Sequence, residues 1–369
     1  MYRPLWIEIN LGALRYNFKE VKKKVGPLVK VMATLKQEAY GHGLIPVARE
    51  LSRCGVDFFG LGSMEEAITL RRRGFREPIL ILSVVDKRFV HEFVKYKVIP
   101  TVVDLSFARA LNREAAKHNK RVRVHIKVDT GMGRLGVWYK DGVSFIKEIA
   151  RLKNLVIEGL FTHFPVADTD RRFTLRQINL FNDLVTTLKK EGTKFKYLHC
   201  ANSVGLTNYK EAHFNLVRPG LILYGIKPFP IDIRLKPLLS LKSRVIFVKR
   251  VERGRSISYG RTFITSHPCY IATVACGYAD GYPWTLSNHS KAIVKGKMFD
   301  VVGRVCMDHI MVNLKNNRVK EGTTVTLIGR EDSAEIKVED IASWAGTIPY
   351  EIVTRLSLKI PRIYKSPSS

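Results

Sequence analysis

VKVMATLKQEAYGHG, residues 29–43, is the stretch of this sequence that decides the fold. Its first part, 29–35, is a mostly apolar run with the length of a buried strand, and Lys36 follows it directly, before Gly41 and Gly43. In α/β folds the polar residues that follow a strand meet at the mouth of the sheet or barrel. We therefore expect a parallel sheet to begin here and to deliver Lys36 to its mouth.

The rhythm of this stretch repeats over about the first 225 residues. Short β-branched or apolar runs alternate with longer segments, such as 64–74, 105–120 and 172–191, that carry apolar residues at helical spacing. Eight βα repeats close into a (β/α)8 barrel of the TIM type, so an α/β fold is predicted. The expected strands are 29–35, 58–62, 78–82, 98–103, 121–128, 156–162, 197–201 and 216–224.

The pattern changes after residue 230 to short strands separated by glycine, asparagine or aspartate. This change predicts a mostly antiparallel β domain over residues 233–369, after a barrel domain over residues 1–232. The segment 6–9 is also strand-like, and we expect residues 1–10 to pair with the second domain. The expected strands of the second domain are 241–251, 270–276, 290–294, 301–313 and 323–328, with one helix at 338–345.

The composition is typical of a globular protein, with 46% hydrophobic and 26% charged residues. No basic segment followed by an apolar run opens the chain, and no apolar run approaches the roughly 20 residues that a bilayer needs. A cytoplasmic protein without a membrane partner is therefore expected. The five cysteines are scattered without a CxxC pair, which predicts neither disulfides nor a metal site. The net charge of +29 is spread along the chain, so no nucleic-acid partner is expected.

Polar residues gather where the expected barrel strands end, which is where barrel enzymes build their active sites. They are Lys36 and Tyr40 after the first strand, Lys127, Asp129 and Arg134 at the fifth, His163 at the sixth, Asn202 and Ser203 after the seventh, and Arg218 and Gly220 on the eighth. One polar residue at such a place has little meaning. A constellation on five strands indicates an active site.

The sequence resembles the alanine racemases, enzymes that depend on pyridoxal 5'-phosphate (PLP) and whose hallmark is KANAYGHG. Residues 36–43 here are KQEAYGHG. The other matching segments, in the order of the family, are KVDTGMGRLG at 127–136, FTHF at 161–164, ANS at 201–203, VRPGLILYG at 217–225, SYGRTF at 258–263, GYADGYP at 277–283, VGRVCMD at 302–308 and TIPYE at 347–351. The resemblance implies an isomerase that interconverts L-alanine and D-alanine, supplies D-alanine for peptidoglycan and works as a homodimer with active sites at the interface.

Two bases are needed for racemisation, because a proton leaves one face of Cα and returns to the other. A lysine amine can form a Schiff base with an aldehyde cofactor and is free to act as a base once the substrate displaces it. The resemblance assigns these roles to Lys36, as the base for the D-isomer. It assigns the L-isomer to Tyr259, which would enter from the second subunit. Met307 would arrive with Tyr259 and help to hold the substrate carboxylate, which Arg134 would orient.

The resemblance also implies how the cofactor is held. Arg218 would face the pyridine nitrogen and donate a hydrogen bond without protonating the ring, which favours racemisation over transamination. His163 would form hydrogen bonds around Arg218 and the second base. The phosphate would be held by Tyr40, Ser203, Tyr350 and the amides of Gly220 and Leu221, beside Asn202.

Lys127 matches a lysine that many family members carry as a carbamate formed with carbon dioxide. The modification would change its charge from positive to negative and fix Arg134 through charge-assisted hydrogen bonds. An unmodified Lys127 that is solvated or paired with Asp129 is the alternative.

Two departures from the family pattern leave the substrate open. Gln37 and Glu38 replace the usual Ala-Asn, and Trp284 stands where the family often has arginine on the substrate corridor. A racemase of broader specificity is therefore an alternative. A PLP-dependent decarboxylase of basic amino acids, which shares the architecture, would place an acidic residue where Arg218 stands. A non-catalytic PLP carrier would resemble the first domain only.

Overall fold

The alternation of strands and helices is present in the computed structural model, which describes residues 3–365. Within these residues the first part of the chain holds eight strands that run in parallel around a barrel. They are β2 (Lys30–Thr34), β3 (Phe58–Leu61), β4 (Ile79–Ile81), β5 (Thr101–Val102), β6 (Val122–Asp129), β8 (Leu155–Phe161), β9 (Tyr197–His199) and β10 (Leu216–Val217), with the short β7 (Val137–Trp138) beside β6.

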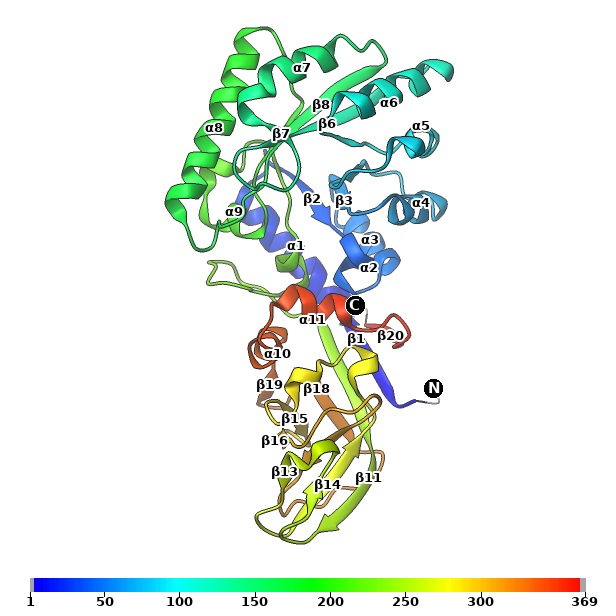
Figure 1. Cartoon of the computed structure of the whole chain (residues 1–369), viewed down its shortest axis with the longest axis vertical. Helices are drawn as coiled ribbons and strands as arrows, with labels where there is room; N and C mark the ends of the chain where they lie inside the picture. Colours follow the sequence, from blue (N-terminus) through cyan, green and yellow to red (C-terminus); the bar gives the residue numbers. More distant parts are fainter. Residues whose placement is uncertain (1–2, 366–369) are drawn as a thin grey trace.

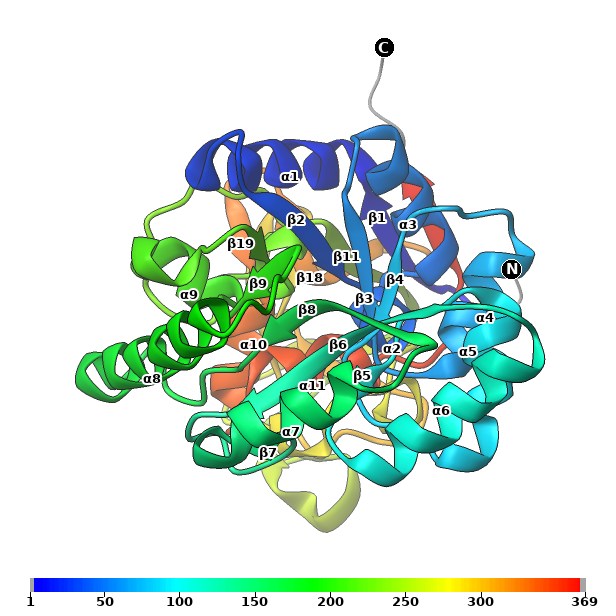
Figure 2. The same cartoon turned by 90° about the horizontal axis from the view of Figure 1, so that it is seen from above.

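Hydrogen bonds close these strands into a ring. One sheet has the order β10-β2-β3-β4 and another β5-β6-β8-β9. A parallel bridge between Leu80 and Ile99 joins the sheets on one side. On the other side the amide of Arg218 donates to the carbonyl of Ala201 at 2.9 Å. Figure 2 shows the strands in the centre and the helices around them. The predicted barrel is confirmed.

Helices cover the outside of the barrel, and five of them begin at a side-chain cap, including one at Asn10 and one at Asn202. Ser63, Asp104 and Asp170 each accept a hydrogen bond from a backbone N–H in the first turn, as N-cap residues do. The helices are α1 (Leu11–Val25), α3 (Leu44–Arg53), α4 (Met64–Arg72), α5 (Val90–Tyr96), α6 (Leu105–Lys117), α7 (Gly142–Ala150), α8 (Arg171–Lys190) and α9 (Ser203–Asn208).

The last part of the chain is mostly antiparallel β-sheet, which confirms the second half of the predicted fold class and lies below the barrel in Figure 1. Its strands are β11 (Leu239–Val251), β14 (Cys269–Val274), β15 (Lys291–Val294), β16 (Lys297–Val301), β17 (Ile310–Asn313), β18 (Thr324–Glu331), β19 (Ala334–Ile336) and β20 (Arg362–Lys365), with the separate pair β12 (Ser256–Ile257) and β13 (Phe263–Ile264). The N-terminal strand β1 (Leu5–Asn10) belongs to this sheet, antiparallel to β11 and parallel to β20.

Three predicted strands are wrong in extent, and the one expected at 98–103 is reduced to the two residues of β5. The strand expected at 216–224 ends at Val217, because Pro219 has no N–H to continue the ladder, and residues Leu221–Tyr224 form the 3-10 turn η4. The strand expected at 301–313 is divided into β16 and β17 by a loop in which Gly303 has a φ of 73°.

Helix α10 (Val338–Ala345) has the predicted bounds, whereas α11 (Pro349–Arg355) was not predicted. In Figure 1, α11 lies between the barrel and the β part. No helix within residues 3–365 combines the length and the apolar character that a membrane span requires.

Candidate active site at the barrel mouth

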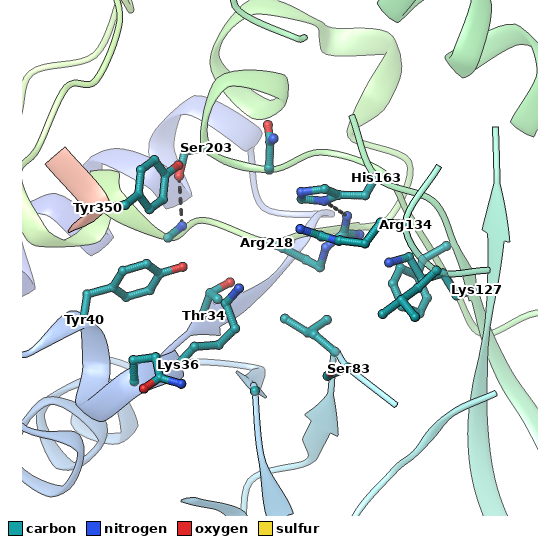
Figure 3. A pocket seen from close by; sticks show the side chains of 17 residues that line it. Thr34, Lys36, Tyr40, Ser83, Lys127, Arg134, His163, Ser203, Arg218 and Tyr350 are labelled. Carbon is teal, nitrogen blue, oxygen red and sulfur yellow. Dashed lines mark hydrogen bonds between the residues drawn. The ribbon is translucent and has the colours of Figure 1, made fainter. Parts of the chain in front are cut away.

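A cavity of about 580 Å³ opens at the carboxyl ends of the barrel strands (Figure 3). Its wall carries four cationic side chains and several hydroxyls, and no carboxylate is among the described residues that line it. They are Thr34, Lys36, Gln37, Tyr40, Gly62, Leu82, Ser83, Lys127, Arg134, Leu135, Phe161, His163, Asn202, Ser203, Arg218, Gly220 and Tyr350. Such a wall suits an anionic ligand.

Lys36 reaches this cavity from the end of β2 through an unusual turn. Residues 37–40 all have positive φ, between 52° and 54°, so that the segment labelled α2 (Lys36–Tyr40) is a left-handed turn. Non-glycine residues in this conformation each cost about 1 kcal/mol or more. The carboxylate of Glu66 offsets part of this cost by accepting N–H donation from Glu38 at 3.0 Å and from Gly62 at 3.3 Å. The turn aims Lys36 and Tyr40 into one cavity.

The environment of Lys36 favours its neutral amine. Burial is the largest cause that lowers the pKa of Lys36, and Arg134 and Arg218 lower it further, whereas Glu66 opposes them. A lysine with a lowered pKa is a better nucleophile toward an aldehyde, because more of its amine is neutral at a given pH.

Neutral donors gather at one end of the cavity, around Tyr40, Ser203 and Tyr350 (Figure 3). The amide of Gly220 donates to Ser203 Oγ at 2.9 Å, and a Cβ on Gly220 would lie 3.0 Å from the hydroxyl of Tyr40. Glycine therefore keeps the space between these hydroxyls open. Burial raises the pKa of both tyrosines, so their hydroxyls stay protonated as donors. A phosphate fits this end.

Two predicted cofactor residues have other surroundings. Asn202 lines the cavity, but its side-chain oxygen accepts a hydrogen bond from Gly205 at 2.9 Å and so caps α9. The side chain of Leu221 is fully buried and lies outside the lining of the cavity. A contribution of Leu221 is thus limited to its backbone.

Arg218 is a buried cation at the other end of the cavity, with 4% of its surface exposed. Its terminal nitrogens donate to the carbonyls of Thr162, His199 and Cys200 and to ring nitrogens of His199 and His163, at 2.6–3.3 Å. No carboxylate pairs with Arg218 within residues 3–365, and its Nε–H makes no hydrogen bond there. Burial lowers its pKa to about 10, so the group remains charged at neutral pH. The guanidinium of Arg218 is thus fixed in place, and its Nε–H remains available to a ligand.

Lys127, Arg134 and His163 lie beside Arg218 (Figure 3). Lys127 is 2% exposed, and burial, followed by the charges of Arg134 and Arg218, lowers its pKa to about 8. Asp129 forms no hydrogen bond or ion pair with Lys127 within the described chain. Its carboxylate instead accepts the amides of residues 131–133 at 2.8–2.9 Å and so shapes the loop that carries Arg134.

His163 is neutral in this cationic surrounding. Burial and the charge of Arg218 hold its pKa well below the ordinary value. It can therefore accept from Arg218, whose Nη2 lies 3.3 Å from its Nδ1.

The structure does not bring Tyr259 and Met307 to this cavity. Both belong to the β part and are among its most exposed large side chains, at 72% and 54%. Tyr259 lies between β12 and β13, and β13 is far from the barrel strands in Figure 1. Trp284 is also exposed and outside the cavity, where the guanidinium of Arg304 lies 4.8 Å from its ring.

Sequence reasoning missed six residues of the lining, namely Thr34, Gly62, Leu82, Ser83, Leu135 and Phe161. Most of them end a barrel strand or follow it directly, so the rule that located Lys36 applies to them too. They were missed because small and apolar side chains gave no chemical reason to single them out. Of the two departures after Lys36, Gln37 lines the cavity, whereas Glu38 points to α3 and accepts the amide of Leu44 at 3.1 Å.

These residues fit PLP. The glycine-spaced hydroxyls leave room for a phosphate, Lys36 is a partly buried amine for an aldehyde, and Arg218 has a free donor for a ring nitrogen. No group of three or more His, Cys, Asp or Glu side chains in the described chain is placed to hold a metal ion. A barrel with such a site and an appended β-sheet defines the class of barrel-type PLP-dependent enzymes.

Comparisons with known proteins identify the family within this class. The family described as "Alanine racemase, N-terminal domain" matches residues 9–228, and "Alanine racemase, C-terminal domain" matches residues 238–364. The chain belongs to the alanine racemase family. The alanine racemase of Halothermothrix orenii is 42% identical over 369 residues, which cover 99% of this chain and 97% of the relative.

Two solved structures are similar over nearly their whole length. The alanine racemase of Clostridium difficile 630 has a TM-score of 0.93 at 35% identity and covers 99% of this chain and 96% of its own. The histidine racemase from Leuconostoc mesenteroides subsp. sake has a TM-score of 0.91 at 30% identity and covers 99% of both chains. The architecture thus serves more than one substrate amino acid.

Proposed function

We propose that this protein racemises alanine with PLP held at Lys36, and that Lys36 and Tyr259 are its two bases. The cofactor, when bound, supplies the electron sink that stabilises a carbanion at the substrate Cα. The observation that carries the proposal is the buried guanidinium of Arg218, which no carboxylate neutralises within the described residues. A decarboxylase of the same architecture would have an acidic residue there.

Lys36 has two tasks in this proposal. Its amine holds the cofactor covalently until the substrate amine takes its place. The free Nζ then removes or returns the Cα proton on one face of the substrate. The lowered pKa of Lys36 supports both tasks, because it makes the neutral amine easier to form.

Arg134 orients the substrate carboxylate, and Lys127 in its carbamate form would hold Arg134. Carbamylation joins the neutral amine to carbon dioxide and releases one proton. The pKa of about 8 leaves a usable fraction of neutral amine at pH 7. An anion at Lys127 would also relieve the repulsion among the cations of this wall, which supports the modified form.

The second base requires a second copy of the chain. Tyr259, Tyr278, Trp284 and Met307 are large exposed side chains of the β part. They are neighbours, since the amide of Tyr278 donates to Cys306 next to Met307, and Arg304 lies against Trp284 and beside the glycine that follows Tyr259. A contiguous exposed patch of this kind supports a protein interface. We infer a homodimer in which each copy lends Tyr259 to the cavity of the other.

The domain limits proposed with this function are 1–232 and 233–369, although residues 1–2 and 366–369 lie outside the described part. Cytoplasmic location and the supply of D-alanine for peptidoglycan remain predictions.

A racemase of broader specificity is the second candidate. It is favoured by the likeness to a histidine racemase and by Gln37, a polar side chain on the cavity wall where the family usually has alanine. Larger amino acids would then react as well.

One assay separates these functions. The purified protein is incubated with each L-amino acid in heavy water, and the products are resolved by chiral chromatography. We expect D-alanine carrying deuterium at Cα, and more product from alanine than from any other amino acid. Equal rates with several amino acids would favour the broader racemase. Loss of the carboxylate without inversion would overturn both proposals. Lys36→Ala should abolish the reaction, with Lys30→Ala, at the start of the strand that Lys36 follows, as the matched control.

A further inference from the structure

Three buried polar side chains form a line through the barrel interior beneath Arg218. Arg218 Nη1 lies 2.6 Å from His199 Nδ1, and His199 Nε2 lies 2.8 Å from His125 Nδ1. His125 Nε2 faces Glu158 Oε2 at 3.6 Å. Both histidines are fully buried, and Glu158 is 5% exposed. The line joins the strands β9, β6 and β8.

The donors in this line can point in one direction only. A guanidinium donates and never accepts, so Nδ1 of His199 must be the acceptor. A neutral imidazole carries one N–H, which places the proton of His199 on Nε2, facing Nδ1 of His125. The proton of His125 then lies on Nε2, facing the carboxylate. Burial, the largest cause, lowers the pKa of both imidazoles, which agrees with neutral rings.

The last contact explains two atoms that otherwise lack a partner. His125 Nε2 and Glu158 Oε2 are buried and have no hydrogen bond within the described residues. Buried polar groups without a partner destabilise a fold, so most of them are paired. The 3.6 Å separation of these two atoms indicates that each is the partner of the other. Burial raises the pKa of Glu158, but His125, Arg123 and Lys196 together hold the pKa below its ordinary value. Glu158 is therefore an anion that can accept from His125.

The backbone at Glu158 departs from the regular pairing of β6 with β8, at the place where the carboxylate faces His125. Val124 pairs with Ile157, and the next residue, His125, pairs with Gly159, so Glu158 is the extra residue of a β-bulge. A Cβ on Gly159 would lie 2.5 Å from His125 Nδ1, so only glycine admits the ring. The ring of His199 is stacked on Phe161 at 4.6 Å. Bulge, glycine and stacking each fix one member of the line.

The far end of the line reaches the opposite end of the barrel. Glu158 Oε1 forms ion pairs with Arg123 at 3.3 Å and Lys196 at 3.7 Å, and both cations are exposed to solvent. The line thus connects the cofactor end of the barrel with charges on its other surface.

We propose that Glu158 is a positioning residue that fixes the protons on His125 and His199 and thereby holds Arg218 in its donating orientation toward the cofactor. The inference rests on the proposed contact of Arg218 with the cofactor ring. Without the carboxylate, the two imidazoles can take the opposite tautomer. An N–H of His199 would then face an N–H of Arg218, and the repulsion would turn the guanidinium away.

Nitrogen NMR of the purified protein with 15N-labelled histidine tests the line directly. His125 and His199 should each give one protonated Nε2 and one unprotonated Nδ1, with assignments from His125→Gln and His199→Gln variants. A proton on Nδ1 of either ring, or a doubly protonated ring, would overturn the proposal. This measurement does not depend on catalysis.

The variants Glu158→Gln, which keeps an acceptor, and Glu158→Leu, which removes it, test the consequence. Glu148→Gln is the matched control, since Glu148 pairs with Arg109 at 3.4 Å on the neighbouring helix α7. We expect Glu158→Leu to mix the tautomers, to shift the visible absorbance of the bound cofactor and to lower kcat about tenfold, because small misplacements near the chemistry are costly. Glu158→Gln should show smaller changes, and the control none.

The outcomes separate the two proposals. Unchanged tautomers and absorbance in Glu158→Leu, while the wild type racemises alanine, would overturn the role of Glu158 alone. An inactive wild type would contradict the proposed function, and the NMR result would still decide whether the line exists. If Glu158→Leu does not fold, Glu158→Gln and the wild-type spectrum carry the test.

Discussion

The barrel mouth and the patch around Tyr259 differ in how complete they are within one chain. At the mouth, Arg218 is buried and held by five hydrogen bonds, and Lys36 points into the same cavity, which is the preorganisation that catalysis needs. Tyr259 is 72% exposed in the β part and has no such surroundings. In the proposed function, the chain therefore builds the cofactor half of its site unaided, and another copy supplies the other half.

The largest expected effect comes from the buried half. Lys36→Ala should lower kcat about 10⁴-fold, because it removes both the covalent attachment and one base. The visible absorbance of covalently bound cofactor should vanish. Borohydride reduction of the wild type followed by peptide mapping should label Lys36. Label on another lysine would contradict the assignment of Lys36 as the residue that holds the cofactor. Lys30→Ala is the control variant.

The exposed half should behave differently. Tyr259→Phe should lower kcat about 10³-fold by removing one base, yet keep the cofactor absorbance. Deuterium exchange at Cα should nearly cease from L-alanine and persist from D-alanine. Tyr278→Phe, a change in the same patch, is the control. Equal loss from both enantiomers would contradict separate bases.

Mixing the two inactive variants tests whether the Lys36 and the Tyr259 of one active site come from different subunits. After subunit exchange, Lys36→Ala and Tyr259→Phe should recover about a quarter of the wild-type activity. Half of the dimers are then mixed, and each mixed dimer has one intact site of two. No recovery after verified exchange would mean that each chain completes its own site.

Acid should weaken the barrel through its buried histidines. Burial lowers the pKa of His42 from 6.5 to about 4, so between these values the unfolded chain binds more protons and stability falls as the pH drops. His42 should contribute a loss of about 1.5 kcal/mol in unfolding free energy between pH 6.5 and pH 5. Urea titrations of His42→Asn should show a smaller loss. His289→Asn, on the exposed surface of the β part, should not change it.

The smallest effect is expected at Lys127. Removal of carbon dioxide should lower activity about tenfold, because Arg134 loses a charge-assisted partner, and bicarbonate should restore it. Since the pKa of Lys127 is about 8, carbamylation should grow as the pH rises toward this value. A carbamate signal from 13C-bicarbonate should be absent in Lys127→Met. A signal that persists there would refute the modification at Lys127.

Much of the barrel half could be predicted because it depends on local pattern. Apolar runs locate the strands, and the residue after a strand, such as Lys36, must lie at the mouth. The left-handed turn at 37–40 could not be predicted, because no residue in it is a glycine and its cost is offset by the distant Glu66. The role of Glu158 also escapes a sequence pattern, since a bulge breaks the alternation that would assign its face.

The exposure of Tyr259 and its role in a site could not be predicted from sequence periodicity. SYGRTF is recognisable as a motif, but nothing local indicates that Ser258 has a φ of 66° or that the tyrosine after it is exposed. Whether a surface side chain completes a site depends on a second molecule. Sequence resemblance can suggest that molecule, whereas strand periodicity cannot.

The pairing of β1 with β11 and β20 has a consequence for folding during synthesis on the ribosome. β1 is among the first segments to emerge, but its partner Ser243 follows Leu5 by the entire barrel, and its other neighbour is β20. At usual translation rates β1 waits about 20 to 70 seconds for β20. During this time the barrel can close while both edges of β1 are still unpaired. A strand with unpaired edges is prone to aggregation. Chaperones that bind extended apolar strands would find their target here.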